Sequence, residues 1–355
     1  MKILSVVGAR PQFVKLAPIA AELTAQGHEH VIVHTGQHYD INMSDVFFRD
    51  LGIREPDIHL AVGSGSHGRQ TGAMLASMDE VLEEQRPDWV LVYGDTNSTI
   101  AGTLSAVKMG IPLAHLEAGL RSFNRRMPEE HNRVLTDHAA DLCLAPTQVA
   151  MEHLSREGLA AHSVLVGDVM TDVLLQVRET VKDRAPELPA SIDPERPYYV
   201  ATLHRAENTD DPQRLAAIVS SLAGVDAPVL LLAHPRLRRR AEDHGIDLGQ
   251  GAIEVGDPLP YPQLIRAAMS SAGVITDSGG LQKEAFLLRV PCTTVRTETE
   301  WTETVDLGWN RLVGDPADLV KAVGREAPEP TEATPYGDGH AAGRAVAAIA
   351  SASRR

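Results

Sequence analysis

The chain has 355 residues, 43% of them hydrophobic, which is enough for two domains that each bury a core. Its formal net charge of -15 argues against a general nucleic-acid-binding protein, because a polyanion would be repelled. The apolar run near the N-terminus is too short for a signal peptide, and no later run reaches the roughly 18 residues of a membrane span, so we expect a cytoplasmic protein.

Strand-like and helix-like segments alternate in the first half of the chain. The predicted strands are 2–7, 30–34, 88–93 and 111–116, and the predicted helices are 13–26, 71–85 and 97–109. Gly27 follows the first helix as a C-cap residue does. Strands that alternate with helices favour a parallel sheet covered on both faces.

The second half repeats this alternation. Its predicted strands are 198–203, 228–233 and 273–276, and its predicted helices are 212–223, 262–271 and 280–288. A Pro-rich stretch, 183–197, is interpreted as a linker, and a second one, 326–336, precedes an Ala-rich helix at 339–353. We therefore predict an α/β protein with two Rossmann-like domains, residues 1–170 joined by helix 339–353, and residues 171–338.

Ligands of open α/β sheets bind beyond the carboxyl ends of the strands, so residues that follow strands are the first candidates. The segment 8–12 (GARPQ) follows the first strand without a GxGxxG pattern, and no acidic residue ends the second strand, which argues against a dinucleotide site. Arg10 and Lys15 are candidates for phosphate contacts; the alternative is an ordinary solvated loop. The glycines of 63–68 have Walker-A spacing, but Arg69–Gln70 replace the required Lys–Ser/Thr, so an ATPase is rejected.

Three carboxylates follow predicted strands of the first half. Asp95 comes after 88–93 and is either the N-cap of the next helix, which the motif alone favours, or a catalytic group. Glu117 directly follows the predicted strand 111–116, and Glu129 lies further along the chain in a Pro-Glu-Glu segment. Carboxylates gathered at one loop edge suit proton transfer, because neighbouring charges shift their pKa values. The alternative is a set of structural ion pairs with arginines.

In the second half, His204 and Arg205 follow a strand and suit an anionic ligand, with His204 able to donate a proton. The turn from Ser278 to Gly280 opens a helix whose N-terminus favours phosphate, and Glu284 could accept hydrogen bonds from ribose hydroxyls. The two cysteines, Cys143 and Cys292, form no disulfide framework or zinc set, and HExxH and clustered Asp motifs are absent from the sequence, so no metal site is predicted.

Taken in order, these motifs resemble those of the non-hydrolysing UDP-N-acetylglucosamine 2-epimerases. They are GARPQ (8–12), GQHYD (36–40), GDTNST (94–99), EAGLRS (117–122), PEEHNR (128–133), LHRAEN (203–208), TDSGGLQKEA (276–285) and TEWTETVDLGWN (299–310). The resemblance implies a glycosyltransferase-B-type fold with two parallel sheets facing a cleft. It also implies inversion of C2 of the sugar by elimination and re-addition of UDP, without a nicotinamide or other cofactor.

The resemblance also implies residue roles. The catalytic residues would be Asp95, Glu117, Glu129 and His204, with Glu130 a weaker candidate. The UDP-binding residues would be Arg10, Lys15, Arg205, Ser278, Gly279, Gly280 and Glu284. A second UDP-sugar would bind as an activator near Gln37, Arg69 and Gln70, although Ala206 stands where the family often has another arginine. The expected partners are UDP-N-acetylglucosamine, UDP and a second copy of the chain, without nucleic acid or membrane.

Three other functions fit parts of the pattern. A glycosyltransferase of the same fold would use the same UDP-binding residues but needs an acceptor. A non-catalytic nucleotide-sugar sensor would not need the carboxylates for its function. A hydrolysing epimerase would release the free amino sugar and UDP.

Overall fold

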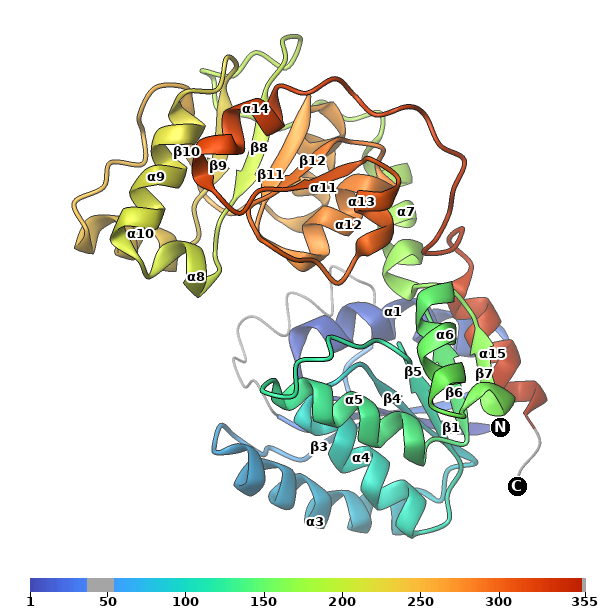
Figure 1. Ribbon diagram of the computed structural model, residues 1–355. Coiled ribbons are helices and arrows are strands. Elements are labelled where there is room, and N and C mark those ends of the chain that lie inside the picture. Colours follow the sequence, from blue (N-terminus) through green and yellow to red (C-terminus); the bar gives the residue numbers. More distant parts are fainter. Residues whose placement is uncertain (37–53, 353–355) are drawn as a thin grey trace. The chain divides into compact units, whose positions relative to one another are not determined.

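The computed structural model describes residues 1–36 and 54–352 and contains two compact units (Figure 1). The first unit comprises Met1–Leu175 and Thr334–Arg355, and the second comprises Gln176–Ala333. Residues 171–175 and 334–338, assigned from the sequence to the second domain, thus belong to the first unit. The carbonyl of Tyr336 explains this, since it accepts hydrogen bonds from the Asp168 backbone N–H at 2.9 Å and the Thr171 hydroxyl at 3.2 Å.

The first unit is built on a seven-stranded parallel sheet in the order β3-β2-β1-β4-β5-β6-β7, which confirms the predicted parallel α/β architecture. Its strands are β1 (Lys2–Val7), β2 (Glu29–His34), β3 (Ile58–His59), β4 (Trp89–Tyr93), β5 (Leu113–Leu116), β6 (Leu142–Ala145) and β7 (Ser163–Leu165). Its helices include α1 (Arg10–Ala25), α3 (His67–Gln85), α4 (Asn97–Lys108), α5 (Pro128–Ala139), α6 (Gln148–Arg156) and α15 (Ala341–Ser351). The sequence did not predict β3, β6, β7, α5 or α6.

Both faces of this sheet are buried. Successive side chains of β1 point to opposite faces, so Ile3 and Val7 pack in one apolar cluster with α1 and α15. Leu4 and Val6 pack in another cluster with α3 and α4. This two-sided burial explains why the N-terminal strand is an almost unbroken apolar run.

Helix α15 returns the C-terminal part of the chain to the first unit, where it packs against α1 (Figure 1). Asp172, in helix α7 (Val169–Val181), accepts hydrogen bonds from the backbone N–H groups of Ala341 at 3.0 Å and Ala342 at 2.7 Å. A carboxylate in this place satisfies free N–H groups at the helix start and interacts favourably with the helix dipole. The Asp172 side chain of α7 thus caps the N-terminus of α15 and joins two segments that are far apart in the sequence.

The second unit has a six-stranded parallel sheet in the order β10-β9-β8-β11-β12-β13. Its strands are β8 (Tyr199–Thr202), β9 (Val229–Leu232), β10 (Ile253–Gly256), β11 (Gly273–Thr276), β12 (Cys292–Thr294) and β13 (Asn310–Leu312). Its helices include α8 (Ala206–Thr209), α9 (Pro212–Ala223), α10 (Pro235–Asp243), α11 (Tyr261–Ser270), α12 (Gly279–Leu287), α13 (Thr302–Asp306) and α14 (Leu319–Val323).

The Pro-rich segment 183–197, interpreted from sequence as a linker, lies within the second unit. Ile192 is buried there in an apolar cluster with Tyr198 and Val200, so the segment is part of the folded structure. Among residues 1–36 and 54–352, no helix combines the length and apolarity needed to cross a membrane.

Candidate active site

Several of the predicted site residues lie where the strand order of a sheet reverses. In the first sheet the reversal lies between β1 and β4, and in the second between β8 and β11. Arg10 begins α1 just after β1, and Asp95 follows β4; His204 follows β8, and Ser278 follows β11. Open α/β sheets bind ligands at such points.

Lys15 and Glu117 form an ion pair in the first unit, and both side chains are largely buried. Lys15 projects from α1, while Glu117 follows β5 in a left-handed conformation with φ 72°. Burial acts most strongly on Lys15 and would lower its pKa, but the Glu117 carboxylate, with smaller effects from Asp95 and Asp168, raises the pKa above its ordinary value. A fixed cation and a carboxylate thus stand together at the edge of the sheet.

Gly94 lies beside the Lys15–Glu117 ion pair and, having no side chain, leaves room for it. The residue has φ 62°, and a Cβ atom on it would lie 3.1 Å from Glu117 Oε2 and 3.3 Å from Lys15 Nζ. Gln12 holds the neighbouring turns, since its Nε2 donates to the Tyr93 carbonyl at 2.7 Å and its Oε1 accepts from the Gly8 N–H at 2.8 Å. The motifs after β1 and β4 therefore serve partly to bring these turns together.

Asp95 is paired with an arginine. Arg133 in α5 donates from Nε at 2.9 Å and from Nη2 at 2.6 Å to Asp95 Oδ2. Burial favours the neutral form of Arg133, but the charges and hydrogen bonds of Asp95 and Glu130 together outweigh burial and raise the pKa of Arg133. The interpretation of Asp95 as the N-cap of α4 was wrong: the cap is Thr96, whose side chain accepts from the Thr99 N–H. This leaves the Asp95 carboxylate turned to Arg133.

The adjacent glutamates at the start of α5 differ sharply. Glu130 is 4% exposed, and its carboxylate accepts from the Ser122 N–H and hydroxyl and the Phe123 N–H, each at 2.9 Å. Burial raises the pKa of Glu130, but these hydrogen bonds and Arg133 together lower it below its ordinary value. Glu129 is partly exposed and, within the described residues, has no hydrogen bond or ion pair. The structure therefore gives Glu130 a role in holding the loop and leaves Glu129 available.

His204 in the second unit is held by a buried aspartate. Asp277 is fully buried and accepts from the backbone N–H groups of His204 at 3.1 Å and Arg205 at 3.0 Å, and from Asn208 Nδ2 at 3.0 Å. Its Oδ1 is also 2.9 Å from His204 Nδ1. Burial raises the pKa of Asp277, but the hydrogen bonds from His204, Asn208 and Arg205 lower it, so the carboxylate is ionised. His204 Nδ1 thus donates, and Nε2 is the nitrogen open to chemistry.

The turn before α12 is shaped by small residues. Ser278 caps the helix, its Oγ accepting from the Leu281 N–H at 3.4 Å. A Cβ atom on Gly279 would lie 2.6 Å from Glu300 Oε1, so the Glu300 side chain would have to move aside, whereas a Cβ on Gly280 would approach only Ser278 Oγ, at 3.9 Å. The exposed N–H groups of such a helix start favour phosphate.

The other predicted residues have different surroundings. Arg205 Nε donates to the Asp277 carbonyl at 2.9 Å, and Glu284 Oε1 accepts from the Tyr261 hydroxyl at 2.9 Å. Gln70 is buried, and its amide bonds Asn97 Nδ2 and the Gly63 carbonyl, whereas Arg69 is exposed on α3. Gln37 lies outside the described residues.

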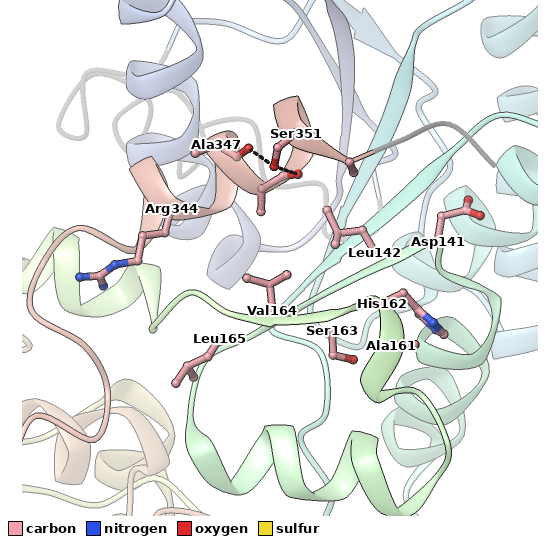
Figure 2. A pocket seen from close by; sticks show the side chains of 12 residues that line it. Asp141, Leu142, Ala161, His162, Ser163, Val164, Leu165, Arg344, Ala347 and Ser351 are labelled. Carbon is pink, nitrogen blue, oxygen red and sulfur yellow. Dashed lines mark hydrogen bonds between the residues drawn. The ribbon is translucent and has the colours of Figure 1, made fainter.

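A cavity of about 560 Å³ opens beside the edge strand β7 and contains none of the predicted site residues (Figure 2). It is lined by Val164 and Leu165 of β7 and by alanines of α15, and its surface is mainly apolar. We therefore place the candidate active site at the strand ends and not in this cavity. Searching residues 1–36 and 54–352 for three clustered His, Cys, Asp or Glu side chains finds no candidate metal site.

The sequence model that describes UDP-N-acetylglucosamine 2-epimerase matches residues 21–350 of the chain. The chain belongs to this family. It is therefore an epimerase, and a glycosyltransferase or a non-catalytic sensor is disfavoured.

Family relatives match over nearly the whole chain. A UDP-2,3-diacetamido-2,3-dideoxy-D-glucuronate 2-epimerase of Pseudomonas aeruginosa is 46% identical, covering 97% of this chain and 98% of its own length. UDP-N-acetylglucosamine 2-epimerases of Methanocaldococcus jannaschii and Escherichia coli are 41% and 32% identical, covering 91% and 98% of this chain and the same shares of their own lengths.

Solved structures of the epimerase family have the same fold. The Methanocaldococcus jannaschii enzyme in complex with UDP-GlcNAc and UDP has a TM-score of 0.83, with 37% identity over 99% of both chains. The Neisseria meningitidis enzyme bound to UDP-GlcNAc has a TM-score of 0.86, with 28% identity over 99% of this chain and 100% of that one. A galactosyltransferase with 14% identity and a TM-score of 0.56 shares the fold alone. The glycosyltransferase-B-type architecture expected for the epimerase is confirmed.

Sequence reasoning missed two residues of this epimerase's candidate site, Asp277 and Arg133. Each lies inside a quoted motif, but each acts through partners distant in sequence: Asp277 through residues 204–208, and Arg133 through Asp95. A usable signal for Asp277 was its place directly after β11, at the reversal of strand order.

Proposed function

We propose that the protein reversibly inverts C2 of a UDP-linked 2-acetamido sugar, interconverting UDP-N-acetylglucosamine and UDP-N-acetylmannosamine. The observation that carries this proposal is the group of carboxylates at the carboxyl edge of the first sheet, with Glu117 beside Lys15, Asp95 beside Arg133, and Glu129 unpaired within the described residues. Such groups provide the proton transfer that inversion of a C–H centre requires.

The C2 proton is not adjacent to a carbonyl, so we propose elimination in place of direct deprotonation. A carboxylate takes the C2 proton, the C–H electron pair forms the C1–C2 double bond, and the C1–O bond to the β-phosphate breaks. UDP leaves with that bonding pair, giving 2-acetamidoglucal. In the return step a phosphate oxygen bonds C1, and the double-bond pair takes a proton at C2 on the opposite face.

The residue roles follow from this chemistry. Asp95, Glu117 and Glu129 remove and return the C2 proton, and His204, held through Nδ1 by Asp277, donates from Nε2 at the departing phosphate. The UDP-binding residues proposed are Arg10, Lys15, Arg205, Ser278, Gly279, Gly280 and Glu284. Two of these have support in their surroundings: Gly279 and Gly280 lie at the start of α12, where N–H groups favour an anion.

A second candidate substrate is UDP-2,3-diacetamido-2,3-dideoxy-D-glucuronate. The Pseudomonas aeruginosa enzyme named for it is 46% identical to this chain, whereas the Methanocaldococcus jannaschii UDP-N-acetylglucosamine enzyme is 41% identical. Both substrates share the C2 acetamido group and the UDP leaving group, so the same elimination applies. They differ at C3 and C6, which the carboxylate group at C2 does not distinguish.

The test is incubation of the protein alone with each sugar nucleotide in deuterated water. We expect the C2 epimer of one or both, with deuterium at C2. Turnover of the glucuronate alone would reassign the substrate, and release of free amino sugar with UDP would indicate a hydrolysing enzyme. No turnover of either would overturn the proposal. Glu117→Gln should lower kcat by about a hundredfold or more, because a proton-transfer group is lost.

We further propose that the protein is a cytoplasmic homodimer with a second UDP-sugar site near Gln37, Arg69 and Gln70. Both cysteines are free and buried, as suits a reducing compartment, and Arg69 is exposed on α3. Light scattering tests the dimer. Sigmoidal rates that become hyperbolic in Arg69→Ala would support the second site, and hyperbolic rates in the unaltered protein would count against it.

A further inference from the structure

His115 is a buried residue of β5 whose two ring nitrogens both face acceptors. Nδ1 lies 2.6 Å from Asp137 Oδ1, and Nε2 lies 2.8 Å from the Gly94 carbonyl oxygen. A carbonyl oxygen only accepts, so Nε2 carries a proton. Asp137 is a carboxylate, because its Oδ2 pairs with the Arg121 guanidinium and accepts from the Gly119 N–H. Nδ1 therefore also donates, and the ring is an imidazolium.

The charges around His115 balance. Asp137 Oδ2 accepts from Arg121 Nη1 at 2.7 Å and from the Gly119 N–H at 3.0 Å, and Arg121 Nε donates to Glu157 Oε1 at 2.8 Å. Two cations thus face two carboxylates in a largely buried network. Burial raises the pKa of the nearby Cys143 thiol, which adds no charge. A buried charge is tolerated only with such pairing and hydrogen bonding.

This network touches both turns that carry paired carboxylates of the candidate site. Gly94, whose carbonyl accepts from His115, immediately precedes Asp95. His115 itself lies two residues before Glu117 on the same strand, and Asp137 holds the N–H of Gly119, two residues beyond Glu117. The backbone at Gly94, Glu117 and Gly119 has φ of 62°, 72° and 83°. Glycine adopts this left-handed region freely, but Glu117 is strained there, so the hydrogen bonds of the adjoining residues help to keep its turn in shape.

We propose that His115, held as an imidazolium between Asp137 and the Gly94 carbonyl, is a positioning residue that fixes the turn of Asp95 relative to the turn of Glu117. The role in catalysis rests on the proposed function; the charge state does not. A neutral ring would leave either the carbonyl or the Asp137 carboxylate facing a lone pair. The imidazolium is thus the form in which one side chain joins both turns.

The charge state is tested on the unaltered full chain by long-range ¹H–¹⁵N NMR of isotope-labelled protein, with the His115 ring assigned by through-bond correlation to its own backbone. We expect both ring nitrogens of His115 to be protonated at neutral pH. One unprotonated ring nitrogen would overturn the proposal. This measurement needs no substrate, so it stands even if neither sugar nucleotide is turned over.

The positioning role is tested by comparing His115→Gln with His138→Gln. His138 lies in α5 like Asp137, but its side chain is about half exposed and lies 3.6 Å from Glu157. For His115→Gln we expect kcat to fall by about a hundredfold, as for a small misplacement of catalytic groups, with UDP affinity within about twofold. His138→Gln should match the unaltered protein. A folded His115→Gln with unchanged kcat, or with UDP affinity and kcat lost equally, would overturn the role. If His115→Gln does not fold, the NMR result decides.

Discussion

Substitution of Gly94 by alanine tests whether the Lys15–Glu117 pair depends on the space beside it. Gly94 has φ 62°, and forcing alanine into this left-handed conformation costs about 1–2 kcal/mol of stability. In addition, the new Cβ would lie 3.1 Å from Glu117 Oε2 and 3.3 Å from Lys15 Nζ. These side chains are only 15% and 12% exposed, so they have little room to move aside. We expect the pair to shift and kcat to fall by about tenfold or more.

The matched control is Gly110→Ala. Gly110 also has a left-handed backbone, with φ 69°, but a Cβ there would meet no other atom within 4 Å. Both variants should lose about 1–2 kcal/mol in urea unfolding, because both carry the same backbone strain. Only Gly94→Ala should lose epimerisation rate, measured by NMR of the C2 epimers. Equal rates in the two variants would refute the idea that the space at Gly94 positions the ion pair.

Three further predictions follow from burial and hydrogen bonding. Glu129→Gln should lower kcat by about a hundredfold with an unchanged melting temperature, whereas Glu130→Gln should lose about 2 kcal/mol of stability in urea unfolding; the reverse pattern would exchange their roles. Burial lowers the pKa of His34 from 6.5 to about 4, so the unfolded chain takes up the proton first and stability falls as pH drops through this range. On acidification from pH 7 to about pH 4, the free energy of unfolding of His34→Phe should therefore fall by about 3 kcal/mol less than that of the unaltered protein. The same dependence of the free energy of unfolding on pH in both proteins would contradict this. Asp277→Ala should lower the stability of the second unit by about 3 kcal/mol in calorimetry, while the exposed Asp257→Ala should not; equal effects would count against a structural role for the buried carboxylate.

The sequence located the strand ends correctly because apolar runs and the residues after them are local signals. The parallel architecture and the positions of Asp95, Glu117, His204 and Ser278 relative to strands follow from such runs. The cap of α4 was misplaced by one residue, because aspartate and threonine are both good N-caps and only the long-range pairing with Arg133 separates them.

Two causes account for what the sequence did not predict: short elements and contacts between residues that the sequence does not place together. The segment 139–182 holds short strands and helices whose periodicity is too brief to read, so β6, β7 and α6 were not predicted. Glu130 and Glu129 are adjacent and identical, yet one is satisfied by backbone N–H groups of residues 122–123 and the other is not. Only the folded loop distinguishes them.

Each unit contains a histidine paired with a buried aspartate, but the two pairs have different roles. In each, a buried aspartate receives a histidine Nδ1 and backbone N–H groups of a turn at the strand ends: Asp137 with His115, and Asp277 with His204. His115 is fully buried with both nitrogens bound, so it has no site at which to exchange a proton. The His204 side chain is 51% exposed and, within the described residues, bonded at Nδ1 alone. Burial of the second ring nitrogen therefore distinguishes a histidine that positions the site, His115, from one that can transfer a proton, His204. The sequence motifs around the two histidines do not predict that difference.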